Sequence, residues 1–340
     1  MDPARLHQLM DFWPARITIA AAELDIFSAL ADDASADEVA AARGTDPRAT
    51  SVLLNALVAL ELVTVNQQGY RIAEPLREAL LPGPRCIVPG FQHRATLWYS
   101  WTKLAEVVRT GQPTVDPYER DERPDEQVQS FIGAMAVGAR MSAPAAVAAL
   151  EIDAPAHVLD IGGGPGVYAE EFCRAHPGVQ VTILDLPRVC EIARQRLAST
   201  EHAECISFIT GEVRSVDRTA ALSPTDGTGY DLVFSSNLIH SMDEEQVQIL
   251  FARQVGWCRA GGRVAVKDFL MADDLTEPAR GALFAVNMLV NTPGGRTYRW
   301  TEVEQWLRDA PAGVGGRKVT GTTRISLPDN MSGIVVAAVH

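Results

Sequence analysis

The second half of the chain alternates short apolar strands with helical segments, and this pattern constrains the fold more than any other feature. Five strand-like runs follow one another: "HVLDIGG", "QVTILDL", "CISFITGEV", "YDLVFSSNLI" and "GRVAVKDFLM". Segments between them, such as "VCEIARQRLAS", have the length and apolar spacing of helices. Apolar strands separated by helices are typical of a parallel sheet covered on both faces. Residues 317–340 predict two further strands that close the sheet edge.

The first 100 residues predict a different, mostly helical domain. A capping box at Ser35 and Glu38 opens one helix, Asp46 caps the next, and residues 62–74 alternate like a small hairpin. Two helices followed by a hairpin are the winged-helix pattern. Such a domain binds DNA in some proteins and joins subunits in others.

The charge distribution favours the second role. The chain has a net charge of −13, and residues 1–100 hold eight Arg and Lys against twelve Asp and Glu. The helix "PRATSVLLNALVALE", at the position of a recognition helix, has one Arg and a wide apolar face. Phosphate binding requires concentrated positive charge. We therefore expect a homodimerisation domain and no nucleic-acid partner.

Other bulk features predict a cytoplasmic protein. No apolar run approaches the roughly 20 residues of a membrane span, and the N-terminus lacks the apolar region of a secretory signal. The five cysteines show no paired or CxxC spacing, which favours reduced thiols and argues against a zinc site; they are Cys86, Cys173, Cys190, Cys205 and Cys258. No membrane partner and no metal are expected.

The stretch "HVLDIGGGPGVYAEEF" indicates the ligand of the predicted sheet. Gly162, Gly164 and Gly166 follow the first strand, but Val167 stands where a dinucleotide fingerprint has its third glycine. Asp160, at the strand end, would oppose an anionic pyrophosphate and suits a cationic ligand better. S-adenosylmethionine (SAM) carries a sulfonium, an amino-acid tail and no phosphate. SAM is therefore favoured over NAD(P).

Acidic residues at the next two strand ends agree with this interpretation. Asp185 lies nineteen residues after Gly166, where its carboxylate can accept hydrogen bonds from ribose hydroxyls. NAD sites use an acid there too, so Asp185 alone does not discriminate. Glu212 follows the third strand, where it could accept from an adenine amino group.

Together these motifs resemble the small-molecule, SAM-dependent O-methyltransferases of plants and bacteria, which include caffeate-type enzymes and polyketide and antibiotic tailoring enzymes. The matching pieces are "VLDIGGGPGVYAEEF", "VTILDLPRVCEIAR", "FITGEV", "SSNLIHSMDEEQ", "RAGGRVAVKDFLM" and "NMLVNTPGG". The resemblance implies an α/β fold with a Rossmann-like class I methyltransferase sheet and an N-terminal all-helical winged-helix dimerisation domain. It implies domains at 1–100 for dimerisation, 101–150 for a helical connector that lines the substrate pocket, and 151–340 for SAM binding and catalysis.

The resemblance also implies a role for each cofactor-binding residue. The three glycines would border the methionine part of SAM, Asp185 and Leu186 would hold the ribose, and Glu212 with Val213 would flank the adenine. The backbone near Ser236 would complete the pocket. The family more commonly has Asp where Glu212 stands.

His240 follows the fourth strand, at the edge where open α/β sheets bind substrates. The family's general base is a histidine here, and a neutral imidazole can take a phenol's proton as the oxygen attacks the methyl carbon. Asp268, at the end of the fifth strand, matches an acidic position that steers this histidine. No metal is required, because the sulfonium already activates the methyl group.

Three positions depart from the common family pattern. Ser241 and Met242 replace Asp and Trp, and Thr297 stands where many plant members have a second glutamate. We expect weaker base catalysis, a more acidic hydroxyl, or a carbon or nitrogen nucleophile. Residues that match substrate-lining positions, or that add polar anchors beside them, are Phe131, Met135, Asn287, Met288 and Asn291. A flat, largely apolar molecule with a hydroxyl is the expected substrate.

Overall fold

The computed structural model describes residues 3–114, 125–213, 229–311, 316–329 and 331–340, which include every predicted site residue. The chain divides into two compact units. One comprises Met1–Tyr99 with Asp125–Val137, and the other comprises Ser100–Pro124 with Gly138–His340. Each is described by itself.

The first unit contains short helices and one hairpin. Its elements are α1 (Pro3–Met10), α2 (Trp13–Glu23), η1 (Phe27–Leu30), α3 (Ala36–Arg43), α4 (Pro47–Ala59), β1 (Val63–Asn66), β2 (Gly69–Ile72), η2 (Glu74–Leu76) and α5 (Arg77–Leu80). Two longer helices, α6 (Val88–Trp101) and α8 (Asp125–Leu150), contribute residues to both units. The core of the first unit is formed by apolar residues such as Phe27, Leu54 and Ile72.

Local signals in the sequence explain where these elements begin and end. The side chains and backbones of Ser35 and Glu38 cap each other at the start of α3, and Asp46 caps α4. The strands β1 and β2 pair antiparallel, from Val63 opposite Ile72 to Asn66 opposite Gly69. The predicted capping box and hairpin are therefore confirmed.

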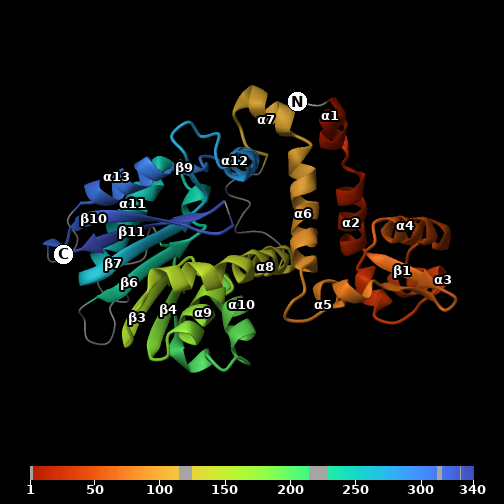
Figure 1. The fold of residues 1–340 in the computed structure, drawn as a ribbon, viewed down its shortest axis with the longest axis horizontal. Helices are drawn as coiled ribbons and strands as arrows, with labels where there is room; N and C mark the ends of the chain where they lie inside the picture. The colour runs from red at the N-terminus through yellow and green to blue at the C-terminus, as the bar shows by residue number, and fades with distance from the viewer. Residues whose placement is uncertain (1–2, 115–124, 214–228, 312–315, 330) are drawn as a thin grey trace. The chain divides into compact units, whose positions relative to one another are not determined.

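The second unit is built around a seven-stranded sheet in the described part of the chain (Figure 1). Its strands are β3 (Ala156–Ile161), β4 (Val179–Asp185), β5 (Ile206–Thr210), β6 (Tyr230–Ser236), β7 (Cys258–Asp268), β10 (Val319–Ser326) and β11 (Gly333–Val339). Their order is β10-β11-β7-β6-β3-β4-β5. β3 to β7 pair parallel, whereas β11 pairs antiparallel with both β7 and β10. The predicted parallel sheet and its two closing strands are confirmed.

Helices cover both faces of this sheet (Figure 1). On one face lie α9 (Val167–Ala175) and α10 (Pro187–Leu197), where Tyr168 and Phe172 pack on Phe234 of β6. On the other face lie α11 (Glu244–Trp257) and α13 (Trp300–Asp309), in a core that includes Val233, Val266 and Phe251. The remaining elements are α7 (Leu104–Thr110), η4 (Ala203–Cys205), η5 (Ile239–Ser241), β8 (Leu270–Met271), α12 (Ala279–Asn291) and β9 (Tyr298–Arg299).

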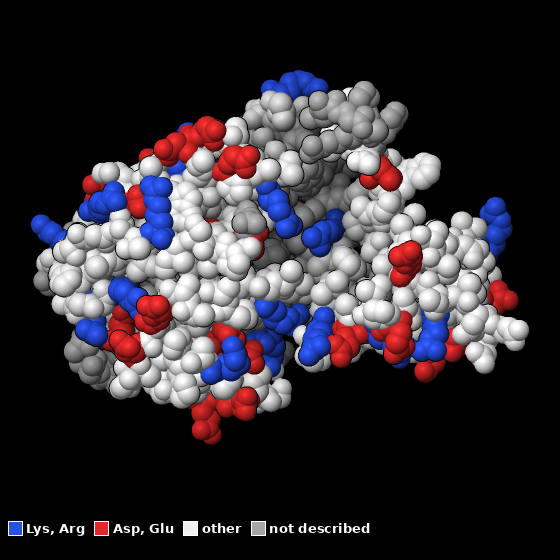
Figure 2. All heavy atoms as spheres, viewed as in Figure 1, with Lys and Arg blue, Asp and Glu red and all other residues white. Residues whose placement is uncertain are grey.

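The surface carries mixed charge. On the face drawn in Figure 2, basic and acidic side chains lie interspersed, as expected for a chain with 30 Lys and Arg and 43 Asp and Glu. Many of these charges pair locally, for example Arg85 with Glu78 and Arg71 with Glu74. This pattern differs from the continuous basic stripe of a nucleic-acid-binding surface.

Two sequence-based expectations were wrong. Cys173 of α9 and Cys205 of η4 form a disulfide, although reduced thiols were expected; Cys86, Cys190 and Cys258 are free. The two cysteines are 32 residues apart in sequence, and only packing of α9 against the β5 side of the sheet brings them together.

The second expectation was that no apolar run approaches the length of a membrane span. The stretch Val128–Leu150 of α8 is long and apolar enough to cross a membrane by length and composition, a criterion that core helices of soluble proteins also meet.

The start of β11 offers a test of the packing beside the sheet edge. A Cβ on Gly333 would overlap the indole of Trp300, whereas one on Gly321 of the neighbouring β10 would meet nothing within 4 Å. Gly333→Ala should therefore lower the free energy of unfolding by about 1–3 kcal/mol, as overpacking does. Urea unfolding monitored by tryptophan fluorescence measures this, with Gly321→Ala as the control. Equal stability of the two variants would contradict the packing.

Candidate active site

Asp160 occupies the carboxyl end of β3 and is almost completely buried, at 1% exposure. Its Oδ2 has no hydrogen-bond partner among the described residues and lies against Gly163 in the turn that follows. Burial, with a smaller contribution from the nearby Asp185 carboxylate, raises the pKa of Asp160 to about 7. A buried carboxylate without a partner is costly, so this position favours a cationic group beside it.

Asp185 ends β4 and holds the glycine turn. Its Oδ2 accepts a hydrogen bond of 2.8 Å from the N–H of Gly164, and its Oδ1 accepts one of 2.7 Å from the N–H of Leu186. Burial raises the pKa of Asp185, and the two N–H donors partly offset this. A carboxylate can accept about four hydrogen bonds, so capacity remains for ligand hydroxyls.

The glycine turn has an open side. Gly162, Gly164 and Gly166 have φ angles of +64°, +54° and +74°, which other residues adopt only with strain. A Cβ on Gly166 would stand 2.7 Å from Leu197, but one on Gly164 would meet only the carbonyl oxygen of Gly162, at 3.9 Å. A ligand can therefore approach the backbone at Gly164. The lack of a side chain at Gly166 lets the start of α9 pack closely against Leu197 of α10.

The other predicted cofactor residues lie at neighbouring strand ends. Glu212 is half-buried and Val213 is buried two and three residues after β5. Ser236 ends β6, and its hydroxyl donates to Oδ1 of Asn237. Leu186 is exposed at the N-cap of α10. A buried carboxylate without a partner, an open glycine turn and acidic side chains on three strand ends fit the ammonium, ribose and adenine of SAM.

His240 and Asp268 meet at the same edge. His240 lies on η5, after β6, and Asp268 ends the adjacent β7. The His240 Nδ1 lies 2.7 Å from Asp268 Oδ1, and that same oxygen accepts from the N–H of Phe269 at 2.8 Å. The His240 side chain is partly buried, at 13% exposure, and that of Asp268 is buried, at 2%.

The charge state of Asp268 determines which nitrogen of His240 can act. Burial alone would raise the pKa of Asp268, but His240, the Phe269 N–H and Lys267 outweigh it, and the pKa lies below its usual value. An ionised carboxylate only accepts, so Nδ1 of a neutral His240 carries the hydrogen and Nε2 has the lone pair. No described residue hydrogen-bonds to Nε2.

Two phenylalanines enclose the imidazole and were not singled out from the sequence. Phe269 stacks on the His240 ring at 5.6 Å between centroids, and Phe284 of α12 meets it edge-on at 4.9 Å. Their rings also contact each other. Phe269 directly follows Asp268 in the sequence, which was a usable signal; nothing in the sequence connected Phe284 with His240.

Lys267 is a third residue that sequence reasoning missed. It is 2% exposed, and its Nζ donates to Oδ1 of Asn237 at 2.6 Å. The N–H of Asn237 in turn donates to the backbone oxygen of Lys267 at 2.8 Å. This reciprocal pair joins the ends of β6 and β7, three residues before His240 and one residue before Asp268.

The predicted substrate residues are divided between the two units. Asn287, Met288 and Asn291 lie on α12 in the second unit, whereas Phe131 and Met135 lie on the part of α8 that belongs to the first. The Asn287 Oδ1 accepts from Trp101 Nε1 and from Asn291 Nδ2, at 2.9 and 3.1 Å. Asn287 and Asn291 are thus hydrogen-bonded to each other. A substrate-binding role for all five residues stays a prediction.

The three positions that depart from the family pattern have defined surroundings. The hydroxyl of Ser241 donates to the backbone oxygen of Leu238, Met242 joins the core, and Thr297 is buried at 4% exposure. The Asp268 carboxylate is consequently the only acidic side chain within ion-pair distance of His240 in the described chain.

The fold and this edge define a class I, SAM-dependent methyltransferase. The chain belongs to the O-methyltransferase family, because residues 101–311 match the family's O-methyltransferase domain and residues 7–75 match its dimerisation domain. The expected family, fold class and cofactor are confirmed.

Individual relatives agree with this assignment. The chain is 32% identical over 308 residues to a 3-hydroxy-5-methyl-1-naphthoate 3-O-methyltransferase from Streptomyces sahachiroi, a match that covers 88% of this chain and 86% of that protein. It is 28% identical over 338 residues to the tetracenomycin polyketide synthesis 8-O-methyl transferase TcmO from Streptomyces glaucescens, covering 97% and 96%. The structure of human N-acetylserotonin methyltransferase in complex with SAM has a similar fold, with a TM-score of 0.83, 23% identity, and 99% and 98% coverage.

The buried carboxyl of Asp160 predicts a pH-dependent stability. An aspartate in the unfolded chain loses its proton near pH 4, whereas Asp160 in the folded protein does so near pH 7. Between these values the folded state holds the extra proton, so the free energy of unfolding falls as the pH rises. Asp160→Asn removes this penalty and should stabilise the ligand-free protein, by at most about 4 kcal/mol at pH 8 and less at pH 5.

Thermal unfolding at both pH values measures this effect. Asp153→Asn, an exposed carboxyl before β3, is the control and should change stability little at either pH. A stabilisation by Asp160→Asn of the same size at pH 5 and pH 8 would show that Asp160 is not the titrating group.

Proposed function

We propose that this O-methyltransferase methylates a hydroxyl of a small aromatic secondary metabolite, with His240 as the general base. The observation that carries the proposal is the partly buried hydrogen bond between His240 Nδ1 and Asp268, beside the strand ends that fit SAM. It leaves the Nε2 lone pair without a protein partner among the described residues.

The roles of the two side chains follow from this geometry. His240 Nε2 takes the proton of the acceptor hydroxyl, and Asp268 stabilises the imidazolium that forms while holding the ring in one tautomer. Phe269 and Phe284 restrict the ring and exclude water from its sides. SAM, when bound, supplies a methyl group activated by the sulfonium. The chain's remaining contribution is alignment of the acceptor oxygen with that methyl.

Asp160, Asp185 and Glu212 would hold the cofactor. Asp160 would face the ammonium of the methionine tail, Asp185 and Leu186 the ribose, and Glu212 with Val213 the adenine. Gly162, Gly164 and Gly166 would border the methionine part, and the backbone near Ser236 would complete the pocket. Both the orphaned Oδ2 of Asp160 and the open side of Gly164 support this arrangement.

The names of the relatives indicate the substrate class. The Streptomyces sahachiroi enzyme acts on a hydroxynaphthoate and TcmO acts in tetracenomycin polyketide synthesis. A fused aromatic polyketide with a phenolic hydroxyl is therefore the proposed acceptor. Phe131, Met135, Asn287, Met288 and Asn291 are proposed to contact it.

A carbon or nitrogen acceptor on the same scaffold is the second candidate. The observation that favours it is the absence of a carboxylate at Thr297, which leaves Asp268 as the single acidic partner of His240 among the described residues. We further propose a cytoplasmic homodimer that assembles through the N-terminal domain, as the match to the dimerisation domain supports.

Replacing the base tests the proposed mechanism. His240→Ala should lower kcat at least ~10²-fold, the usual scale for loss of a general base, while SAM affinity stays nearly unchanged. Methyl transfer to 3-hydroxy-5-methyl-1-naphthoate and a panel of other hydroxynaphthoates measures the rate. His340→Ala, an exposed histidine at the C-terminus, is the control. Unchanged turnover in His240→Ala would remove His240 from the mechanism.

Calorimetric titration tests the proposed SAM contacts. The wild-type protein should bind SAM and S-adenosylhomocysteine and should not bind NAD. Asp185→Ala should weaken binding of both sulfur nucleosides about tenfold or more, because it removes a charged acceptor. Asp153→Ala, an exposed carboxyl before β3, is the control. Unchanged affinity in Asp185→Ala would mean that Asp185 does not hold the ribose.

A further inference from the structure

We propose that Tyr298, together with the Gly294-Gly295 turn, is a positioning device for His240. The inference rests on the proposed role of His240 as the base. It concerns the segment from His240 to Glu244, onto which residues 294–298 pack at several points. The buried hydroxyl of Tyr298 and the two glycines hold the backbone of this segment in place, and thereby keep the imidazole against Asp268. We call Tyr298 and the Gly294-Gly295 turn the clamp.

The segment that carries His240 has little intrinsic rigidity. η5 is a single turn of three residues without a side-chain cap at its start. It lies between the end of β6 and the start of α11, and Asn237 at its entry has a φ of +53°. A hydrogen bond of 2.7 Å between His240 and Asp268 requires the backbone at residue 240 to be held accurately, because such bonds weaken steeply with misalignment.

The Gly294-Gly295 turn forms one side of the clamp by direct contact with the segment that carries His240. A Cβ on Gly295 would overlap the backbone oxygen of His240 and would lie 3.1 Å from Cα of Ser241. A Cβ on Gly294 would lie 2.8 Å from Cβ of Asp243. Neither glycine has a positive φ, so close approach explains their presence better than backbone conformation does.

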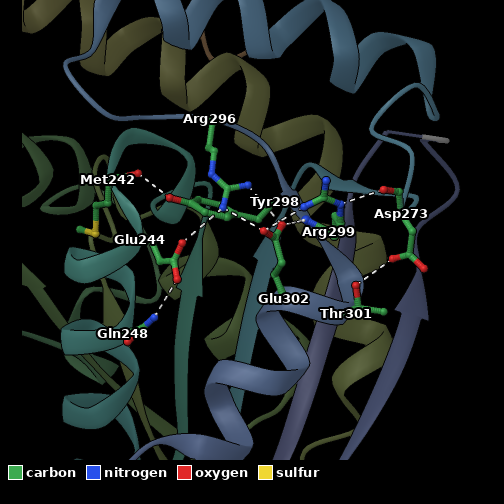
Figure 3. Close-up of polar contacts among 9 residues, drawn as sticks. All are labelled: Met242, Glu244, Gln248, Asp273, Arg296, Tyr298, Arg299, Thr301 and Glu302. Atoms are coloured by element: carbon green, nitrogen blue, oxygen red, sulfur yellow. Dashed lines mark hydrogen bonds and ion pairs between the residues drawn. The ribbon is translucent and has the colours of Figure 1, made fainter.

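Tyr298 supplies the second side through one hydrogen bond. Its hydroxyl donates to the backbone oxygen of Met242 at 2.7 Å, and the side chain is 1% exposed (Figure 3). Burial raises the pKa of Tyr298 to about 12, so the hydroxyl keeps its proton and remains a donor across the working pH range. The carbonyl that accepts this bond lies two residues after His240.

A network of charged side chains fixes Tyr298 itself. The Arg296 guanidinium lies over the Tyr298 ring, 4.2 Å from its centroid, and donates to both carboxylate oxygens of Glu302 (Figure 3). Glu302 also accepts from the backbone N–H and the side chain of Arg299. Burial alone would raise the pKa of Glu302, but Arg296 and the Arg299 N–H outweigh it and lower the pKa.

The network is anchored at both ends. Arg299 donates to the backbone oxygen of Asp273, and Thr301 donates to its carboxylate (Figure 3). Arg296 lies 4.0 Å from Glu244, the first residue of α11. The clamp therefore connects β9 and α13 with the segment after His240. It provides positioning at a turn where Thr297 supplies no carboxylate.

Tyr298→Phe tests the inference because it removes only the hydroxyl. We expect about a tenfold fall in kcat with the KM for SAM unchanged, the scale of one lost buried hydrogen bond. The acid limb of the pH–kcat profile should move to lower pH, because a displaced imidazolium is less stabilised by Asp268. NMR titration of the His240 ring should show the same direction of change without any methyl acceptor.

Tyr230→Phe is the matched control. Tyr230 is a buried tyrosine at the opposite end of β6, hydrogen-bonded to Thr182, so the variant loses a comparable hydroxyl far from His240. It should leave kcat and the pH profile unchanged. An unshifted acid limb and His240 titration in Tyr298→Phe, or the same changes in Tyr230→Phe, would overturn the inference.

A second pair of variants probes the glycine side. Gly295→Ala should displace the His240 backbone and lower kcat more than Tyr298→Phe does, whereas Gly321→Ala should not. The result for His240→Ala separates the two proposals. If that variant is inactive while Tyr298→Phe and Gly295→Ala match the wild type, only the clamp is wrong. If His240→Ala is fully active, the proposed base is wrong and the clamp falls with it.

Discussion

Parallel pairing of β3 with β4 on one side and β6 on the other is the constraint on which the rest of this structure depends. Parallel neighbours bring their carboxyl ends to a single edge. At that edge Asp160 ends β3, Asp185 ends β4, and the turn that carries His240 follows β6. β7 extends the same edge with Asp268. Residues up to 108 positions apart in the sequence thus become parts of one site.

Two buried carboxyl groups at this edge, those of Asp268 and Asp160, have pKa values shifted in opposite directions. Asp268 stays ionised because His240, a backbone N–H and Lys267 surround it. Asp160 has no such partners, and the neighbouring Asp185 adds repulsion, so it holds its proton until near neutral pH. The first arrangement suits the proposed role of His240 as a base, and the second suits the proposed contact of Asp160 with a cationic group. The buried carboxyl of Asp160 therefore lowers the free energy of unfolding of the ligand-free protein as the pH rises toward neutrality.

His240 is held less by its own short helix η5 than by neighbouring elements. A three-residue turn cannot fix an imidazole, and here the reciprocal Lys267–Asn237 bonds hold its entry. The Gly294-Gly295 turn and the Tyr298 hydroxyl contact the backbone and side chains of residues 240–243, at the end of η5. Phe269 and Phe284 fill the sides of the ring. Every one of these contacts comes from an element other than η5, so the position of His240 depends on the packing of β7, α12 and residues 294–298 around it.

The sequence by itself determined the alternation of strands and helices, the glycine turn, the capping box at Ser35 and the acidic strand ends. These are local features, because burial periodicity, positive φ and helix caps depend on residues only a few positions apart. From them the sheet, the family and SAM as cofactor could be predicted. Only the tertiary structure decided which distant side chains meet. The Cys173–Cys205 disulfide, the ring of Phe284 against His240, the Lys267–Asn237 pair and the hydroxyl of Tyr298 on Met242 all depend on packing between elements far apart in the chain, and no spacing in one sequence encodes such contacts.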